Sequence, residues 1–225
     1  MKLKLIFLIV LIIVLGLIYY ASQFNQNKNT VINSNQPVIN QPAVEKTPAQ
    51  PVVPTTTDFM APISRANERV TKKPFGIKIS PATSPIQPER FSGYHTGTDF
   101  ETFPQEADTT VVINSICDGK VIYRQRVSGY GGVLIQSCEW QGQPITVLYG
   151  HLALSSIDLK IGDDLKAKQS IGDLGQGYSY DTDGERKHLH LGIHKNSAIN
   201  LKGYVQDQSQ LGEWIDWTTL IKSGS

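Results

Sequence analysis

Four of the five histidines in this 225-residue chain fall in three short segments that could hold a metal ion. The first segment places His95 four residues before Asp99, beside flexible glycine. An imidazole and a carboxylate are both zinc-type ligands, and a turn between them would bring both onto one ion. The same two residue types are common in ordinary loops, so this segment alone is weak evidence for a metal site.

The second segment runs Lys-His-Leu-His-Leu-Gly from residue 187 to residue 192. Alternate side chains of a β-strand share a face, so His188 and His190 are expected to point together while Leu189 and Leu191 enter the core. Two imidazoles on one face of a half-buried strand are costly unless something uses them. From this motif alone, metal binding or catalysis and a purely structural role are equally supported.

The other two histidines are less informative on their own. His151 ends an apolar run, where a buried strand is expected to break into a loop, and a histidine there is usually only hydrogen-bonded. His194 shares strand parity with His190, but four residues at ~3.3 Å each place it about 13 Å away. We therefore do not expect His194 to be a ligand.

The elements that must position these residues read as short apolar runs separated by glycine turns. Strands at this spacing predict a mainly β, antiparallel domain over residues 91–222. Only the end of the chain is helical in pattern, which predicts a short C-terminal helix whose tryptophans cap the core. The expected strands are 109–113, 120–127, 132–137, 145–149, 170–174 and 188–194, and the helical residues are Leu211, Trp214, Trp217, Leu220 and Ile221.

The N-terminal part of the chain predicts export. Residues 5–20 are an unbroken apolar run preceded by Lys2 and Lys4. A helix over residues 3–20 would cover roughly 27 Å, close to the ~30 Å of bilayer hydrocarbon, with its N-terminus in the cytoplasm. The alternative is a signal peptide cleaved after Ala21, which would give a secreted protein. Bulky Tyr19 near that point argues for the retained anchor.

Two segments join the expected anchor to the domain. Residues 21–58 are rich in Asn, Gln, Pro and Thr, a composition that predicts a disordered linker. Residues 59–90, here called the lead-in, are punctuated by proline and are expected to pack on the domain, with Phe75, Ile77 and Ile79 alternating as in a short strand.

Charge and cysteine content limit the classes of partner and the cysteine chemistry that are expected. The formal net charge of +1, with both signs mixed along the chain, gives no basic stripe and argues against a nucleic-acid partner. Cys117 and Cys138 lie at similar distances from an expected hairpin turn near Gly129, in an exported chain where a disulfide can persist. An intramolecular disulfide and two small buried thiols are both consistent with this spacing.

Taken together, residues 75–195 resemble the M23 family of zinc metallopeptidases, the lysostaphin and LytM-like cell-wall endopeptidases. The resemblance rests on an ordered set of motifs that covers the predicted domain. They are His-x-Gly-x-Asp-Phe at 95–100, Asp-Gly-Lys-Val at 118–121, Tyr-Gly-Gly at 130–132, Tyr-Gly-His-Leu at 149–152, Ile-Gly-Asp at 161–163 with Lys166 and Ala167, and His-Leu-His at 188–190.

The resemblance implies a role for each site residue. It assigns His95, Asp99 and His190 to one zinc ion per domain. Three protein ligands leave the fourth tetrahedral position open, as a catalytic site requires, and the ion would lower the pKa of bound water toward roughly 7. It also gives His151 and His188 the catalytic places. We expect His188 to act as the base and His151 to stabilise the oxyanion, although the two roles could be exchanged.

The loop before His188 departs from the family pattern, which is usually short and glycine-rich. Residues 175–187 are longer, aromatic and charged here. We expect Tyr178, Tyr180 and Asp181, together with Tyr149, to border a substrate groove. A solvated surface loop is an equally good interpretation of this segment.

The expected function is hydrolysis of peptide cross-links or bridges in bacterial peptidoglycan by a membrane-held zinc endopeptidase. One alternative is a catalytically silent M23-like domain that binds the wall or activates a partner hydrolase. Another is a zinc hydrolase acting on a different exported peptide. The retention of all five site residues favours the enzyme.

Overall fold

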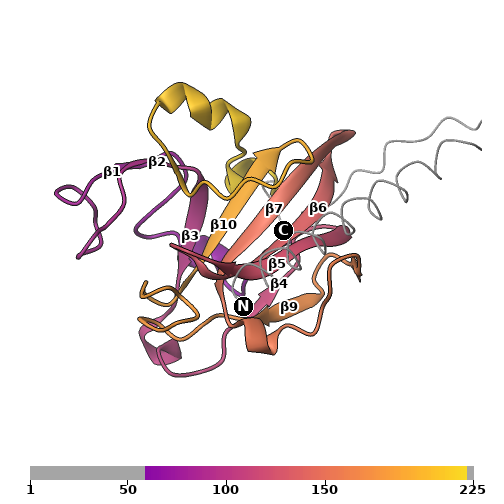
Figure 1. Ribbon diagram of the computed structural model, residues 1–225, viewed down its shortest axis with the longest axis horizontal. Coiled ribbons are helices and arrows are strands. Elements are labelled where there is room, and N and C mark those ends of the chain that lie inside the picture. Colours follow the sequence, from indigo (N-terminus) through magenta and orange to yellow (C-terminus); the bar gives the residue numbers. More distant parts are fainter. Residues whose placement is uncertain (1–58, 222–225) are drawn as a thin grey trace, which may run out of the picture. The chain divides into compact units, whose positions relative to one another are not determined.

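The computed structural model describes residues 59–221, which are the coloured part of the chain in Figure 1. The expected anchor at 3–20 and the expected linker at 21–58 lie outside the described residues. None of the helical segments within 59–221 has the length and apolarity needed to cross a bilayer. The described part is mainly β, and its strands pair antiparallel, as the sequence predicts.

The centre of the fold is a six-stranded sheet in the order β3-β10-β7-β6-β5-β8, whose larger strands lie side by side in Figure 1. A three-stranded sheet, β1-β2-β11, and a two-stranded sheet, β4-β9, accompany it. The strands are β1 (Lys78–Ile79), β2 (Gly93–His95), β3 (Gly97–Glu101), β4 (Val112–Asn114), β5 (Gly119–Val127), β6 (Gly131–Trp140), β7 (Gln143–Leu152), β8 (Asp164–Leu165), β9 (Ser170–Asp173), β10 (His188–Lys195) and β11 (Tyr204–Val205).

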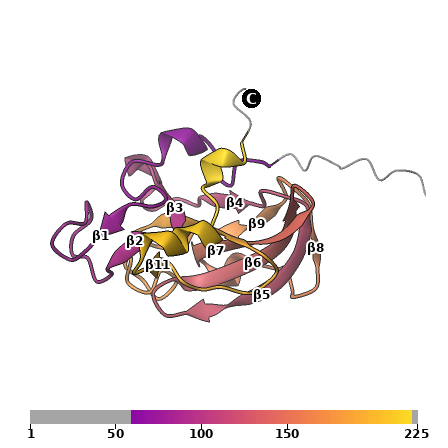
Figure 2. The same ribbon diagram turned by 90° about the horizontal axis from the view of Figure 1, so that it is seen from above.

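The helical elements in the described part are five short 3-10 turns. They are η1 (Ala66–Glu68), η2 (Pro104–Glu106), η3 (Leu154–Ser156), η4 (Gln208–Glu213) and η5 (Trp217–Thr219). The turns η1 and η5 lie on the same side of the large sheet in Figure 2, and their buried residues Ala66 and Trp217 belong to one core. The chain segments before and after the sheet therefore close the same face of it.

Strand parity divides the large sheet into a core face and a site face. On β10, Leu189, Leu191 and Ile193 belong to the main hydrophobic core, whereas His188 and His190 alternate with them on the opposite face. All these residues are buried, because β10 pairs with β3 on one side and β7 on the other. The predicted orientation of the two histidines is therefore confirmed.

The predicted hairpin is formed by β5 and β6, with its turn at residues 128–130. Cys117 and Cys138 lie at its far end and are joined by a disulfide, with their Cα atoms 6.2 Å apart. The choice that the sequence left open is thus settled in favour of the bond. The disulfide ties the loop after β4 to β6, across the main core to which both cysteines contribute.

The lead-in contributes to the core and runs beside β3. Phe59 and Ile63 are part of the main hydrophobic cluster. The backbone amides of Asp99 and Glu101 donate hydrogen bonds to the carbonyls of Lys73 and Arg69, at 3.0 Å each. Residues 69–73 therefore flank the outer edge of β3, opposite β10.

The C-terminal helix predicted over residues 211–221 is wrong as a single continuous helix. The chain forms η4 and η5, and Trp214 between them is extended, forming a backbone bridge with His194. Pairing with the end of β10 therefore breaks the helical repeat. The expected packing is retained, because Trp214, Trp217 and Leu220 are all buried.

The turn expected between His95 and Asp99 is also wrong. His95 ends β2 and Asp99 lies within β3, with only Thr96 between the two strands. β2 pairs with β1 and β11, whereas β3 pairs with β10, so the chain passes from one sheet to the next at Thr96. The change of sheet brings the two side chains together, and a loop is not needed.

Candidate metal centre

Cross-strand pairing brings the first two residues of the site together. Asp99 on β3 lies directly opposite His190 on β10, and side chains in such pairs have Cβ atoms roughly 5 Å apart. His95 approaches from the end of β2. Gly97 makes room for the group, because a Cβ at this position would lie 2.6 Å from the His190 ring.

The donor atoms of His95, Asp99 and His190 form a small triangle, and all lie within 4.8 Å of one another. Nε2 of His95 is 3.0 Å from Nδ1 of His190. Oδ1 of Asp99 is 3.1 Å from His190 Nδ1 and 3.3 Å from His95 Nε2. Zinc with ligands near 2.1 Å in tetrahedral geometry separates its donors by about 3.4 Å, so the triangle is close in size to one face of a zinc tetrahedron.

Neighbouring hydrogen bonds orient His95 for this role. Its Nδ1 lies 3.2 Å from the Pro74 carbonyl oxygen, which can only accept a hydrogen bond. Nδ1 therefore carries the proton, and Nε2 presents its lone pair to the triangle. A backbone or carboxylate partner on the second ring nitrogen is the usual support of a metal-binding histidine. The lead-in supplies that partner here.

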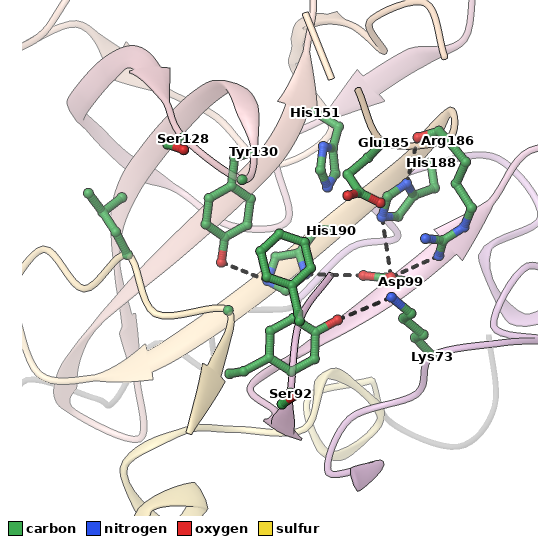
Figure 3. A pocket seen from close by; sticks show the side chains of 15 residues that line it. Lys73, Ser92, Asp99, Ser128, Tyr130, His151, Glu185, Arg186, His188 and His190 are labelled. Atoms are coloured by element: carbon green, nitrogen blue, oxygen red, sulfur yellow. Dashed lines mark hydrogen bonds and ion pairs between the residues drawn. The ribbon is translucent and has the colours of Figure 1, made fainter. Parts of the chain in front are cut away.

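His188 and His151 lie beside the triangle, in the same pocket of about 230 Å³ (Figure 3). Nδ1 of His188 donates to the carbonyl of Arg186 at 2.8 Å, and its Nε2 is 3.2 Å from Oδ2 of Asp99. The His151 ring lies 4.2 Å from the His188 ring, centroid to centroid. The structure thus brings the five predicted site residues together: Asp99, His151, His188 and His190 line the pocket, and His95 contacts Asp99 and His190 from behind it.

His151 has a left-handed backbone, with φ of 64°. Left-handed geometry in a non-glycine residue costs roughly 1 kcal/mol or more and is concentrated at functional sites. The carbonyl of His151 accepts a hydrogen bond from Gly175 at 2.8 Å, which helps to hold this conformation at the end of β7. The imidazole of this strained residue points into the pocket, as Figure 3 shows.

The site is buried, and its electrostatics favour an ionised Asp99 and neutral rings at His190 and His151. Burial alone would raise the pKa of Asp99, but the charges of His188 and His95 and hydrogen bonds from His188 and His190 hold that pKa well below its usual value. Burial lowers the pKa of His190 to about 4, and it also lowers the pKa of His151 well below its usual value. Metal ligands must be deprotonated, so both effects favour binding of a cation.

Comparison with known proteins identifies the family of the domain that carries this site. Residues 93–201 match the model of peptidase family M23. The chain carries a peptidase M23 family domain. Within this M23 domain the His95, Asp99 and His190 site is intact and could hold a metal ion.

Solved structures of several proteins are similar to this M23 domain. They include LytU (24% identity over 68% of this chain and 91% of that chain, TM-score 0.43). Csd3 of Helicobacter pylori is 26% identical over 66% of this chain but only 35% of its own length, with a TM-score of 0.40. A zinc-containing peptidase from Vibrio cholerae is 22% identical over 64% of this chain and 41% of its own, with a TM-score of 0.39. No match was found among curated proteins.

Several residues that line the pocket or contact the triangle were not predicted as site residues. The hydroxyl of Tyr130 lies 3.4 Å from Nε2 of His190, on the side of the ring away from the triangle. Tyr204 of β11 packs against His95, with ring centroids 5.1 Å apart. Arg186 contacts Asp99, and Lys73 lines the pocket. Tyr130 belongs to the Tyr-Gly-Gly motif and could have been found there, whereas Lys73 and Tyr204 lie outside the family match.

The predicted groove residues have different positions. Tyr149 is wrong as a groove residue, because its side chain is on the core face of β7 and is fully buried. Its hydroxyl accepts a hydrogen bond from the Ile116 amide and donates to Gln136. Tyr178 and Tyr180 are exposed, at 77% and 74%, so a contact with substrate stays a prediction for them and for Asp181.

Proposed function

We propose that this protein is a zinc-dependent endopeptidase that hydrolyses peptide cross-links or bridges of bacterial peptidoglycan. The observation that carries the proposal is the triangle of His95, Asp99 and His190 donors with two further imidazoles beside it, on the wall of an open pocket. A structural zinc site would be closed by a fourth protein ligand, usually cysteine, and both cysteines are used in the disulfide. Three ligands beside an open pocket fit a catalytic site.

The donor set suits zinc and hydrolysis. Two imidazoles and one carboxylate are a ligand set of known catalytic zinc sites. When bound, zinc would polarise the scissile carbonyl and acidify water at neutral pH. The remaining steps need a proton acceptor and a donor to the developing oxyanion, and these are the roles that we assign to His188 and His151.

His188 is suited to accept the proton. Its Nδ1 is held by the Arg186 carbonyl, so Nε2 is the nitrogen left to exchange a proton with the reacting groups. Oδ2 of Asp99, 3.2 Å from this nitrogen, would stabilise the imidazolium that forms. A positioned base of this kind contributes roughly 10²–10⁴-fold to the rate.

His151 is suited to stabilise the oxyanion. Burial lowers its pKa, so the ring stays neutral and can donate one N–H to a substrate oxygen. Its Nδ1 is buried without a partner among the described residues. An unpartnered polar atom on a pocket wall is expected where a ligand completes the hydrogen bonding.

The substrate and location rest on the family and on the N-terminal sequence. We propose that residues 3–20 anchor the chain with its N-terminus in the cytoplasm, and that 21–58 form a linker to an extracytoplasmic domain. The catalytic domain would then reach the wall from the membrane. Cell fractionation and the mass of the mature chain test this directly, because cleavage after Ala21 would release a shorter, soluble product.

Digestion of purified peptidoglycan tests the activity. The segment 52–225 contains all the described residues and is the one to use, with zinc, with chelator, and with zinc restored after chelation. We expect new amino termini in the mass spectrum with zinc that vanish with chelator and return with the metal. An unchanged wall despite stoichiometric zinc would contradict the proposal and favour a wall-binding domain or a hydrolase of another peptide.

A further inference from the structure

Arg186 lies beside the proposed metal site and bridges two carboxylates of β3. Its Nε donates to Oε2 of Glu101 at 2.9 Å, and its Nη2 donates to Oδ2 of Asp99, also at 2.9 Å. Nη2 also bonds Oε1 of Glu101, which completes a two-point contact between the guanidinium and that carboxylate. The three residues are 2% to 8% exposed, so water competes little for these bonds.

Because of this contact, the two carboxylate oxygens of Asp99 face different groups. Oδ1 faces Nδ1 of His190 and Nε2 of His95, whereas Oδ2 faces Arg186 and His188. Figure 3 shows Asp99 between the imidazole of His190 on one side and the guanidinium on the other. A carboxylate held in this way offers one oxygen to a metal, and its second oxygen is already engaged.

We propose that Arg186, supported by Glu101, is a positioning residue that fixes Asp99 as a one-oxygen metal ligand. The inference rests on the metal site of the proposed function and adds to it two residues outside the His-x-Gly-x-Asp and His-x-His motifs. Arg186 comes from the charged loop that departs from the usual short, glycine-rich pattern.

The charges explain why Arg186 and Glu101 occur together. A guanidinium bonded to Asp99 alone would bring a positive charge close to the cation and withdraw electron density from its ligand. Glu101 cancels that charge and takes two of the guanidinium bonds, so the net charge of the site is unchanged. The planar fork of arginine can reach both carboxylates at once, which a lysine ammonium cannot do with the same fixed geometry.

A purely structural ion pair is the competing explanation. Buried pairs often add little to stability, and replacing both partners with neutral groups can be tolerated. Thermal stability alone therefore cannot decide between the two roles. Metal affinity and metal spectroscopy can, because a structural pair has no reason to change either.

The experiment uses the full-length protein and four variants: R186M/E101Q, R186K, E101Q and R69M/E106Q. R186M/E101Q removes both charges, so no buried charge is left unpaired. R69M/E106Q is the control, because Arg69 and the half-buried Glu106 also form a two-point pair but touch no side chain of the triangle. Arg69 meets Glu101 only at its backbone carbonyl. Zinc affinity is measured by competition with a chelating dye, and ligand geometry by the visible spectrum of the Co²⁺ form.

We expect R186M/E101Q to bind zinc about 10- to 100-fold more weakly, the range for lost outer-shell partners. Its Co²⁺ absorption should weaken as Asp99 becomes free to bind through both oxygens and the coordination number rises. R186K should fall between this variant and wild type. E101Q should also weaken zinc binding, because the guanidinium charge is no longer balanced. The control R69M/E106Q should stay within about twofold of wild type.

Wild-type zinc affinity and an unchanged Co²⁺ spectrum in R186M/E101Q would overturn the inference, whatever the thermal stability. If that variant does not fold, as judged by near-UV circular dichroism, R186K decides: zinc affinity equal to wild type counts against positioning. Failure of the wild-type protein to bind zinc or Co²⁺ at one ion per chain would instead overturn the proposed function itself.

Discussion

The floor and the rim of the pocket are built in different ways. The floor is the triangle with His188, carried by strands β2, β3 and β10 and almost wholly buried. The rim is the loop over residues 178–185, which is tied down by exposed and half-exposed arginines. Asp183 there receives Arg90 from the lead-in, Arg126 from β5 and the Gly129 amide. Strand pairing positions the floor residues, and surface ion pairs hold the loop that we expect to meet substrate.

The largest effect should come from removing a catalytic group on the floor while sparing the metal. H188A should lower kcat by about 10³-fold, within the usual contribution of a positioned acid or base. D99A is the counterpart and should lose zinc as well as activity. Metal content by mass spectrometry, measured together with hydrolysis, separates the two. Loss of zinc from H188A would mean that His188 is a ligand and would sink its assignment as the base.

Burial of the floor histidines should make the metal-free protein lose folding stability as the pH falls. The pKa of His190 is lowered to about 4 in the folded chain, against roughly 6.5 when unfolded. Below pH 6.5 the unfolded chain therefore takes up a proton that the folded chain refuses until about pH 4. Stability should be fully present above pH 6.5 and should fall toward pH 4 by about 3 kcal/mol from this residue. Burial of His151 acts in the same direction.

Urea denaturation of the chelated protein between pH 7.5 and pH 4 measures this loss. H190N has no titrating ring at that position and should show a shallower dependence over the same range. An equal slope in H190N and wild type would mean that His190 is not kept neutral by burial.

Adding a side chain at Gly97 should weaken metal binding, because the floor is closely packed there. A Cβ there would meet the His190 ring at 2.6 Å and the Leu191 carbonyl at 2.8 Å, so G97A must displace the ligand or the strand. We expect zinc affinity to fall about 10- to 100-fold, comparable to the loss of an outer-shell partner. G212A is the matched control, because a Cβ at Gly212 meets no atom within 4 Å. Equal zinc affinity in the two variants would contradict the argument.

The orientation of side chains could be predicted from the sequence where a single strand carries an alternating pattern. The alternation at 188–191 placed two histidines on one face and two leucines in the core without any long-range information. The ordered motifs then brought together five site residues that belong to four different strands. Local parity and motif order were sufficient because β10 is central and paired on both sides.

Secondary structure and side-chain contacts could not be predicted where pairing between distant segments decides them. The segment 93–98 is rich in Gly and Thr and lacks apolar alternation, so its sequence does not indicate strands β2 and β3. The three- and four-residue spacing at the C-terminus arises from two short turns around an extended Trp214. Arg186 and Glu101 are 85 residues apart and meet only through the register of β3 and β10. Their parity with His188 and Asp99 was the one local signal available.

The rim should give the smallest effect, and that effect should fall on substrate binding. D183N keeps the size of the side chain but removes the charge that holds Arg90 and Arg126. Because these arginines are partly exposed, each pair is worth roughly 1 kcal/mol or less. We expect KM to rise a few-fold with kcat and zinc content unchanged, since the loop loosens while the strands of the floor keep their register. Steady-state kinetics on a defined cross-linked peptide measures both constants, with K120Q at an exposed pair on the β5–β8 edge as control. A fall in kcat without a change in KM would show that the rim helps to align the floor, and the division drawn between them would then be wrong.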